Sequence, residues 1–206
     1  MHVALAMPNW ITGIVGLVKT DDLSKCREAC ELIYYYCYIT DYDFIKIPPA
    51  KRGCTLRIFR TCIEKGLFTT KLVYADPYRA VNELCTKHRI NRLQVIDAAF
   101  TAILKYLIKM GEINCEDNVI VDEELGNYID YLRKVHDRVS VDNDSPIVKL
   151  AKLVASIPDV ATSVSASPRK RCFKISDEFI EIDIVDIHDL VMRDVEDRIR
   201  SILMSN

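Results

Sequence analysis

In most of the chain from residue 21 to residue 157, apolar residues recur at alternating steps of three and four, which is the spacing of amphipathic helices. Residues 67–74 are short and favour a strand, and their assignment is left open. Asp76 followed by Pro77 is typical of a helix start, because the carboxylate caps free N–H groups and proline fits the first turn. Pro48 and Pro49 separate the first helix from the second. The pattern predicts six helices, over residues 21–37, 50–66, 76–88, 91–111, 122–139 and 145–157.

The fourth predicted helix has the longest apolar stripe. Asn91 and Gln94 have the spacing of a capping box at its start, and Gly111 ends it. We expect this helix to be the central member of the fold, with three of its stripe residues fully buried. The stripe consists of Leu93, Ile96, Phe100, Ile103, Leu107 and Met110, and the three buried residues are Phe100, Ile103 and Leu107.

The two ends of the chain follow other patterns. Residues 1–18 contain no charged side chain but are interrupted by proline and glycine, so they are too short to span a bilayer, which takes about 20 apolar residues. We expect residues 1–20 to form a strand or arm packed on the domain or on a second subunit, with a membrane-touching segment as the alternative. Residues 159–171 are predicted to be a linker, and residues 172–206 a strand–helix element with a hairpin near Asp177.

Together these elements predict a mainly α-helical protein, with a bundle-like domain over residues 21–158 and the small C-terminal element. The 206 residues contain only six glycines and seven prolines, which favours helices over a turn-dense sandwich or barrel. An apolar N-terminal arm leaves surface for another subunit to cover, so we expect a homo-oligomer.

Six of the eight cysteines lie in predicted helices, where a free cysteine packs as a small apolar residue, and no secretory signal precedes them. We therefore expect free thiols and a cytoplasmic or possibly nuclear location, since both compartments are reducing. Cys26, Cys30, Cys85 and His88 have the composition of a zinc site, but core packing is the favoured interpretation. No metal and no other cofactor is predicted.

Charge is strongly segregated although the net charge is −2. Residues 45–93 hold eleven basic and three acidic residues, whereas residues 112–144 hold three basic and ten acidic ones. A basic surface with interspersed aromatic residues is typical of phosphate binding. The alternatives are a basic face docked on the acidic block of the same chain, or a solvated face. The predicted nucleic-acid-binding residues, on the second and third helices, are Lys51, Arg52, Arg57, Arg60, Arg89 and Arg92.

A second basic group, Arg169, Lys170 and Arg171, lies in the predicted linker. The favoured interpretation is an ordinary solvated linker. The alternatives are a short basic targeting signal and a patch that contacts phosphate. The phosphate-binding, zinc-protease and nucleophile-elbow motifs are absent from the sequence, so we expect a protein that is not an enzyme.

The Tyr34–Tyr36 run, the low glycine content and the lack of catalytic motifs give the chain the style of small viral accessory proteins, which it resembles in these features. Some of those proteins, such as suppressors of RNA silencing, are helical, oligomeric RNA binders. The resemblance and the charge pattern together predict an RNA-binding accessory protein that contacts the phosphate backbone without sequence specificity. The alternative is a helical adaptor that binds a host protein.

Overall fold

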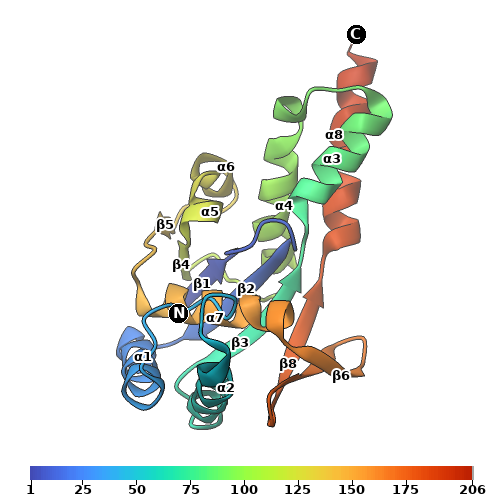
Figure 1. Cartoon of the computed structure of the whole chain (residues 1–206). Helices are drawn as coiled ribbons and strands as arrows, with labels where there is room; N and C mark the ends of the chain where they lie inside the picture. Colours follow the sequence, from blue (N-terminus) through green and yellow to red (C-terminus); the bar gives the residue numbers. More distant parts are fainter. Residues whose placement is uncertain (206) are drawn as a thin grey trace.

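The computed structural model describes residues 1–205, with the backbone alone at residues 165 and 166. It is an α/β fold, about 50% helix and 21% strand, built on one mixed sheet of eight strands in the order β5-β4-β1-β2-β3-β8-β7-β6 (Figure 1). The prediction of a mainly helical bundle, and with it the description of the protein as helical, is therefore wrong. The strands are β1 (His2–Ala6), β2 (Ile14–Thr20), β3 (Thr69–Tyr74), β4 (Asn118–Val121), β5 (Val139–Val141), β6 (Thr162–Ala166), β7 (Lys170–Ile175) and β8 (Glu178–Asp186).

The uncharged N-terminal segment forms the centre of this sheet. Strands β1 and β2 pair as an antiparallel hairpin, with β4 on the outer side of β1 and β3 on the outer side of β2. Strands covered on both faces are apolar throughout, because alternation between core and solvent is lost. The strand was one of the two forms expected for this segment. Its apolar surface is covered within the chain, so it gives no argument for a second subunit.

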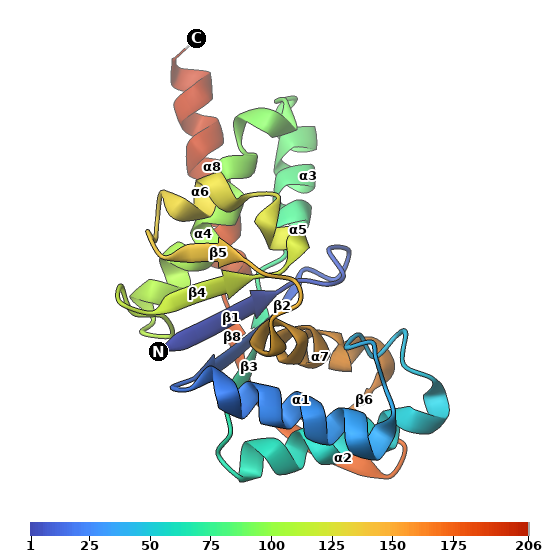
Figure 2. The same cartoon turned by 90° about the vertical axis from the view of Figure 1, so that its left-hand side faces the viewer.

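The helices cover both faces of the sheet (Figures 1 and 2). One layer consists of α1 (Leu23–Cys37), α2 (Pro49–Glu64) and α7 (Pro146–Val160). The other consists of α3 (Pro77–His88), α4 (Ile96–Lys109) and α8 (His188–Met204), with the short helices η1 (Arg92–Gln94), α5 (Glu123–Gly126) and α6 (Ile129–Arg133). Successive residues of β1 point to the two layers in turn: Val3 and Leu5 belong to the core on the α3–α4–α8 side, whereas Ala4 and Ala6 belong to the core on the α7 side.

The small residues on the α7 side allow that helix to lie close to the sheet. Gly16 of β2 shows how close, because a Cβ built on it would lie 2.0 Å from the Ala151 carbonyl oxygen of α7. The sequence shows this glycine only as an interruption of an apolar run. In the structure it is the point where helix backbone and strand backbone meet.

Helix α4 packs against α3, α6 and α8, as expected for a central helix of its layer. Phe100, Ile103 and Leu107 are at most 1% exposed, which confirms their predicted burial. The Phe100 ring stacks on Tyr128 with a centroid distance of 3.6 Å. The fifth predicted helix, by contrast, is split into α5 and α6, and its last residue, Val139, begins β5.

The segment predicted to be a linker is ordered secondary structure. Helix α7 continues past Pro158 to Val160, and β6 and the start of β7 occupy most of the remainder. The hairpin expected near Asp177 is the β7–β8 turn, and the expected last helix is α8. Among the described residues, no helix is long and apolar enough to cross a membrane.

The strand directions bring the carboxyl ends of several strands to one edge of the sheet. Strands β1, β4 and β5 are mutually parallel, β3 is antiparallel to β2 and so parallel to β1, and β8 is parallel to β3. Their carboxyl ends therefore meet at one edge, together with the turn of the β1–β2 hairpin. In open α/β sheets, ligands bind preferentially outside such an edge.

Candidate functional site

The structure divides the six predicted nucleic-acid-binding residues between the two helix layers. Lys51, Arg52, Arg57 and Arg60 lie on α2, whereas Arg89 and Arg92 lie at the turn between α3 and α4 on the opposite face of the sheet (Figure 1). A single surface across the second and third helices therefore does not form. The α2 residues remain as one candidate group.

Two of these four residues also hold the local backbone. Arg52 donates from Nε to the Ile47 carbonyl at 2.9 Å and from Nη2 to the Ile45 carbonyl at 3.0 Å, which closes the loop that leads into α2. Lys51 donates from Nζ to the Tyr38 carbonyl at 2.8 Å, at the end of α1. An ammonium group has three donors and a guanidinium has five, so both Lys51 and Arg52 keep donors for a phosphate, although Arg52 is held in place by two backbone contacts.

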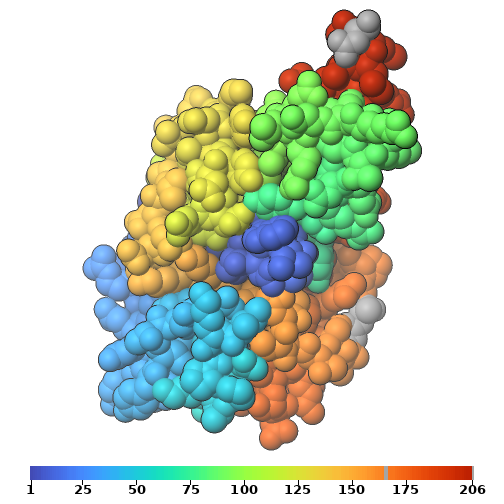
Figure 3. Space-filling model, turned by 45° about the horizontal axis from the view of Figure 1, so that its top comes forward, coloured from blue at the N-terminus to red at the C-terminus, as the bar shows by residue number. Residues whose placement is uncertain are grey.

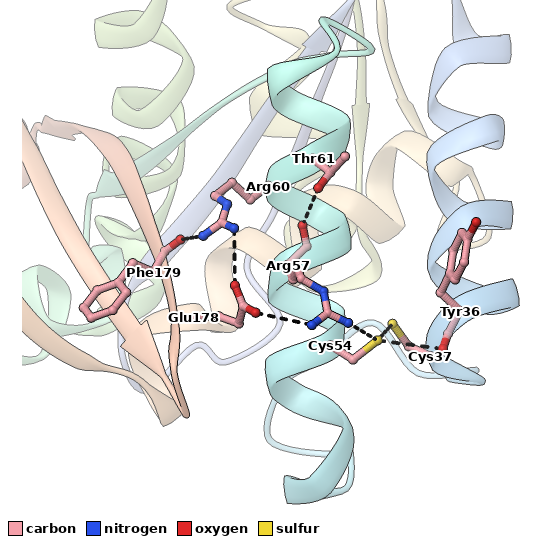
Figure 4. A network of polar contacts seen from close by, with 8 residues as sticks. All are labelled: Tyr36, Cys37, Cys54, Arg57, Arg60, Thr61, Glu178 and Phe179. Atoms are coloured by element: carbon pink, nitrogen blue, oxygen red, sulfur yellow. Dashed lines mark hydrogen bonds and ion pairs between the residues drawn. The ribbon is translucent and has the colours of Figure 1, made fainter.

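Arg57 and Arg60 lie one turn apart on α2 and share Glu178 at the start of β8 (Figure 4). The distances are 3.5 Å from Arg57 Nη1 to Glu178 Oε1 and 3.3 Å from Arg60 Nη2 to Glu178 Oε2. Arg60 also donates to the Phe179 carbonyl at 2.6 Å and pairs with Glu64. Glu178 fixes the two guanidinium groups side by side, and Glu178 and Glu64 together balance their charge, so the excess positive charge of this face comes from the neighbouring lysines Lys51 and Lys174.

Exposed aromatic rings lie on both sides of α2, beside this basic row. Tyr35, Tyr36 and Tyr38 at the end of α1 are 57–70% exposed, because the inward positions of this last turn are taken by Ile33 and Cys37. On the other side of α2, Phe179 is 41% exposed.

A cation–π contact lies beside the basic row on one side, and a contact to the backbone joins the tyrosine segment to α2 on the other. Lys174 Nζ lies 5.3 Å from the centre of the Phe179 ring, and Cys54 of α2 donates to the Tyr36 carbonyl at 3.7 Å. We name the exposed aromatic and basic side chains of these neighbouring elements the tyrosine–arginine strip; it comprises Tyr35, Tyr36, Tyr38, Lys51, Arg57, Arg60, Lys174 and Phe179.

The tyrosine run contributed only to the resemblance described above, and its place beside the basic residues of α2 was not predicted. A usable signal was present. Three consecutive tyrosines within a helix cover about 200° of its circumference, so they cannot all face the core. Phe179 had no comparable signal, because it reaches the strip through the β7–β8 hairpin.

The second predicted basic patch lies elsewhere, at the β6–β7 turn and the start of β7. Lys170 pairs with Glu181 at 3.0 Å and Asp183 at 3.8 Å, and the Arg171 guanidinium lies over the Tyr74 ring. These internal partners satisfy much of the charge of the patch. The acidic block at residues 112–144 reaches the basic block through Glu112, which pairs with Lys71 at 2.6 Å.

A pocket of about 320 Å³ opens at the carboxyl edge of β1 and β4 and was not foreseen from the sequence. The tip of the β1–β2 hairpin, dark blue in the space-filling view, lies beside it between the yellow α5–α6 region and the cyan segment that leads to α2 (Figure 3). The pocket is lined by Pro8, Asp41, Asp43, Lys46, Asp122, Glu123, Glu124, Asn127, Asn143 and Lys152.

Asp122 is the more deeply buried of two buried acids in this pocket, at 1% exposure against 9% for Asp43. Its carboxylate accepts from the Met7 N–H at 2.8 Å and from the Leu125 N–H at 3.1 Å, so it caps α5 and ties it to β1. Burial raises the pKa of Asp122 to about 6, and the two N–H donors act in the opposite direction. The geometry of Asp122 is thus explained by its structural role.

The chain offers no assembled metal centre among its described residues. Cys26 and Cys30 lie on α1, whereas Cys85 and His88 lie on α3 on the other side of the sheet, so the four side chains of the zinc alternative do not meet. The thiols of Cys26 and Cys85 pack in the two separate cores.

No protein family, no curated protein and no solved structure matches this chain. The resemblance to viral accessory proteins therefore has no support, and the mainly helical fold found in some of those proteins is not the fold of this chain.

Proposed function

We propose that this protein binds single-stranded nucleic acid along the tyrosine–arginine strip. The observation that carries the proposal is the placement of exposed aromatic rings on both sides of a basic helix. Unpaired bases stack on aromatic side chains, and lysine and arginine attract the phosphates that connect the bases. The strip supplies both kinds of contact over three adjacent elements, α1, α2 and the β7–β8 hairpin (Figure 4).

The same features favour single strands and tolerance of sequence. A duplex keeps its bases stacked on one another, so exposed tyrosines contribute little to binding it. The cations of the strip position phosphates and read no base edges. RNA and single-stranded DNA share the recognised chemistry. We further propose that the protein acts by binding, in the cytoplasm or nucleus, where its eight free cysteines remain reduced.

Fluorescence anisotropy with labelled oligouridylate and oligothymidylate tests the proposal on the full chain. We expect binding at low salt, with an affinity that falls steeply as salt rises, since phosphate contacts release counterions. A double substitution of Tyr35→Ala and Tyr36→Ala should weaken binding by about 5- to 100-fold, the range for losing one stacked base. A preference for one oligonucleotide would distinguish RNA from DNA.

Matched arginine pairs on the two layers provide the control. Arg57→Gln with Arg60→Gln should reduce affinity and flatten the salt dependence, whereas Arg89→Gln with Arg92→Gln should leave both nearly unchanged. Equal losses for the two pairs would show that the strip is not the site. Absence of binding to either oligonucleotide at low salt would overturn the proposal.

A second candidate function is an adaptor that binds a protein through the same tyrosines. Ile45, 49% exposed, adds apolar surface in the loop between α1 and α2, and tyrosine and arginine are enriched in protein-interaction hot spots. Binding through such a surface should depend weakly on salt. The salt titration therefore separates the two functions.

A further inference from the structure

Helices α1 and α2 pack side by side and bring two cysteine thiols into contact beneath the strip. The sulfur atoms of Cys37 and Cys54 are 2.7 Å apart (Figure 4). A disulfide bond is about 2.05 Å long, so a shift of about 0.7 Å would complete one. The two residues are on different helices, and both are free thiols in this structure.

The two thiols have different surroundings. Cys37 is 4% exposed at the inner side of α1, and burial raises the pKa of its thiol to about 12. Cys54 is partly exposed on α2, and Arg57 Nη2 lies 3.9 Å from its sulfur. An oxidant therefore reaches the partly exposed Cys54 first, next to the Arg57 guanidinium, whereas Cys37 is buried on the inner side of the contact. This is the arrangement of an attacking and a resolving cysteine.

We propose that Cys37 and Cys54 form a reversible oxidation site that closes to a disulfide between α1 and α2, with a peroxide as oxidant. The Cys54 thiolate attacks one peroxide oxygen, the O–O bond breaks, and hydroxide leaves to give the Cys54 sulfenic acid. The Cys37 sulfur then attacks the Cys54 sulfur, and the sulfenic oxygen departs as water with the Cys37 proton. Two thiols and one hydrogen peroxide thus give one disulfide and two waters, and a dithiol reductant reverses the change.

The bond would tie the end of α1 to α2 directly below Tyr36 and Tyr38 and beside Arg57. It closes a loop that starts at Cys37 and ends at Cys54, so it removes freedom from the unfolded chain and raises the melting temperature. The oxidation site is independent of nucleic-acid binding, because it requires only the contact between the two helices.

Peptide mapping of the full chain tests the site directly. The protein is treated with one equivalent of hydrogen peroxide, remaining thiols are blocked with N-ethylmaleimide, and the product is digested with trypsin without reduction. We expect the peptide of residues 53–57, which contains Cys54, linked to the peptide of residues 28–46, which contains Cys37. Dithiothreitol should separate the two peptides and restore the original melting temperature.

Cysteine variants assign the bond, because Cys30 lies in the same peptide as Cys37. Cys37→Ser and Cys54→Ser should each abolish the linked peptide, whereas Cys30→Ser and Cys115→Ser should retain it. In Cys37→Ser, Cys54 has no resolving partner, so dimedone should label its sulfenic acid. Linkage of other cysteines, or direct conversion of Cys54 to sulfinic acid in the parent protein, would overturn the proposal.

Discussion

The two helix layers share one sheet but differ in how they use their polar and aromatic residues. In the α3–α4–α8 layer, charges pair across helices: Lys105 Nζ lies 2.7 Å from Asp194, whose other oxygen accepts from the Tyr106 hydroxyl at 2.6 Å. In the α1–α2 layer, a cluster of tyrosines is left exposed at the end of a helix. The first layer pairs these polar groups across its helices, and the second leaves several aromatic rings exposed to solvent.

The comparison shows why a net charge counted along the sequence is a poor guide to a binding surface. Residues 45–93 are strongly basic as a block, yet the sheet separates α2 from α3 within it. What distinguishes the α2 arginines from Arg89 and Arg92 is their aromatic surroundings and the carboxylate they share. Those neighbours come from α1 and from the β7–β8 hairpin, both outside the basic block.

The largest expected effect is on the stability of the α3–α4–α8 layer. Phe100→Ala should lower the free energy of unfolding by about 3–5 kcal/mol, because it removes a fully buried ring at the centre of α4. Phe179→Ala, on the exposed strip, should cost less than about 1 kcal/mol. Urea denaturation of both variants checks the contrast. Equal losses would mean that the strip is as tightly packed as the core.

A smaller effect concerns Asp122 at the sheet edge. Its pKa of about 6 in the folded protein lies above its usual value of 3.8, so the folded state binds the proton more tightly. Its contribution to stability is therefore complete below about pH 4 and is lost as pH rises through 6, by at most about 3 kcal/mol. Relative to Asp122→Asn, the parent should lose stability between pH 4 and pH 7, as measured by urea denaturation. A gain over this range would show that the Met7 and Leu125 N–H donors outweigh burial.

The smallest expected effect is an increase in oligonucleotide affinity at the α1–α2 layer. Glu178→Gln removes the carboxylate shared by Arg57 and Arg60, so affinity for oligouridylate should rise by about two- to fivefold, since one more charge faces the phosphates. The loss of stability should stay below about 1 kcal/mol, as for other exposed ion pairs.

A matched variant on the α3–α4–α8 layer controls for the loss of a negative charge. Glu83→Gln breaks a comparable exposed pair with Arg79 on α3 and should leave affinity unchanged. If both variants bind more tightly, net charge rather than the strip governs binding.

The helices were largely predictable because their apolar stripes are local in sequence. Phe100, Ile103 and Leu107 repeat at steps of three and four, and the Asp76–Pro77 start is where α3 begins. Strands were expected at the N-terminal segment and at the β7–β8 hairpin, but their assembly into one large sheet was missed for the opposite reason. Strands β1, β2 and β4 are covered on both faces or are very short, so they lack the alternation that identifies a strand.

The candidate site was predictable only in part. Arg57 and Arg60 followed from the charge pattern, because both lie on one helix. The Cys37–Cys54 contact depends on how two helices cross, and Phe179 depends on the pairing of β7 with β8. Neither relation leaves a periodic signal in the sequence.

The central β1–β2 hairpin also has a consequence for the order of events during synthesis. Its two outer edges are completed by residues 69–74 and residues 118–121, which the ribosome adds much later. At 5–20 residues per second, the β1 edge stays open for roughly 5–20 seconds. An apolar hairpin with unpaired edges is an efficient template for intermolecular pairing. Pairing between two nascent chains therefore competes with native pairing at these edges until β4 emerges.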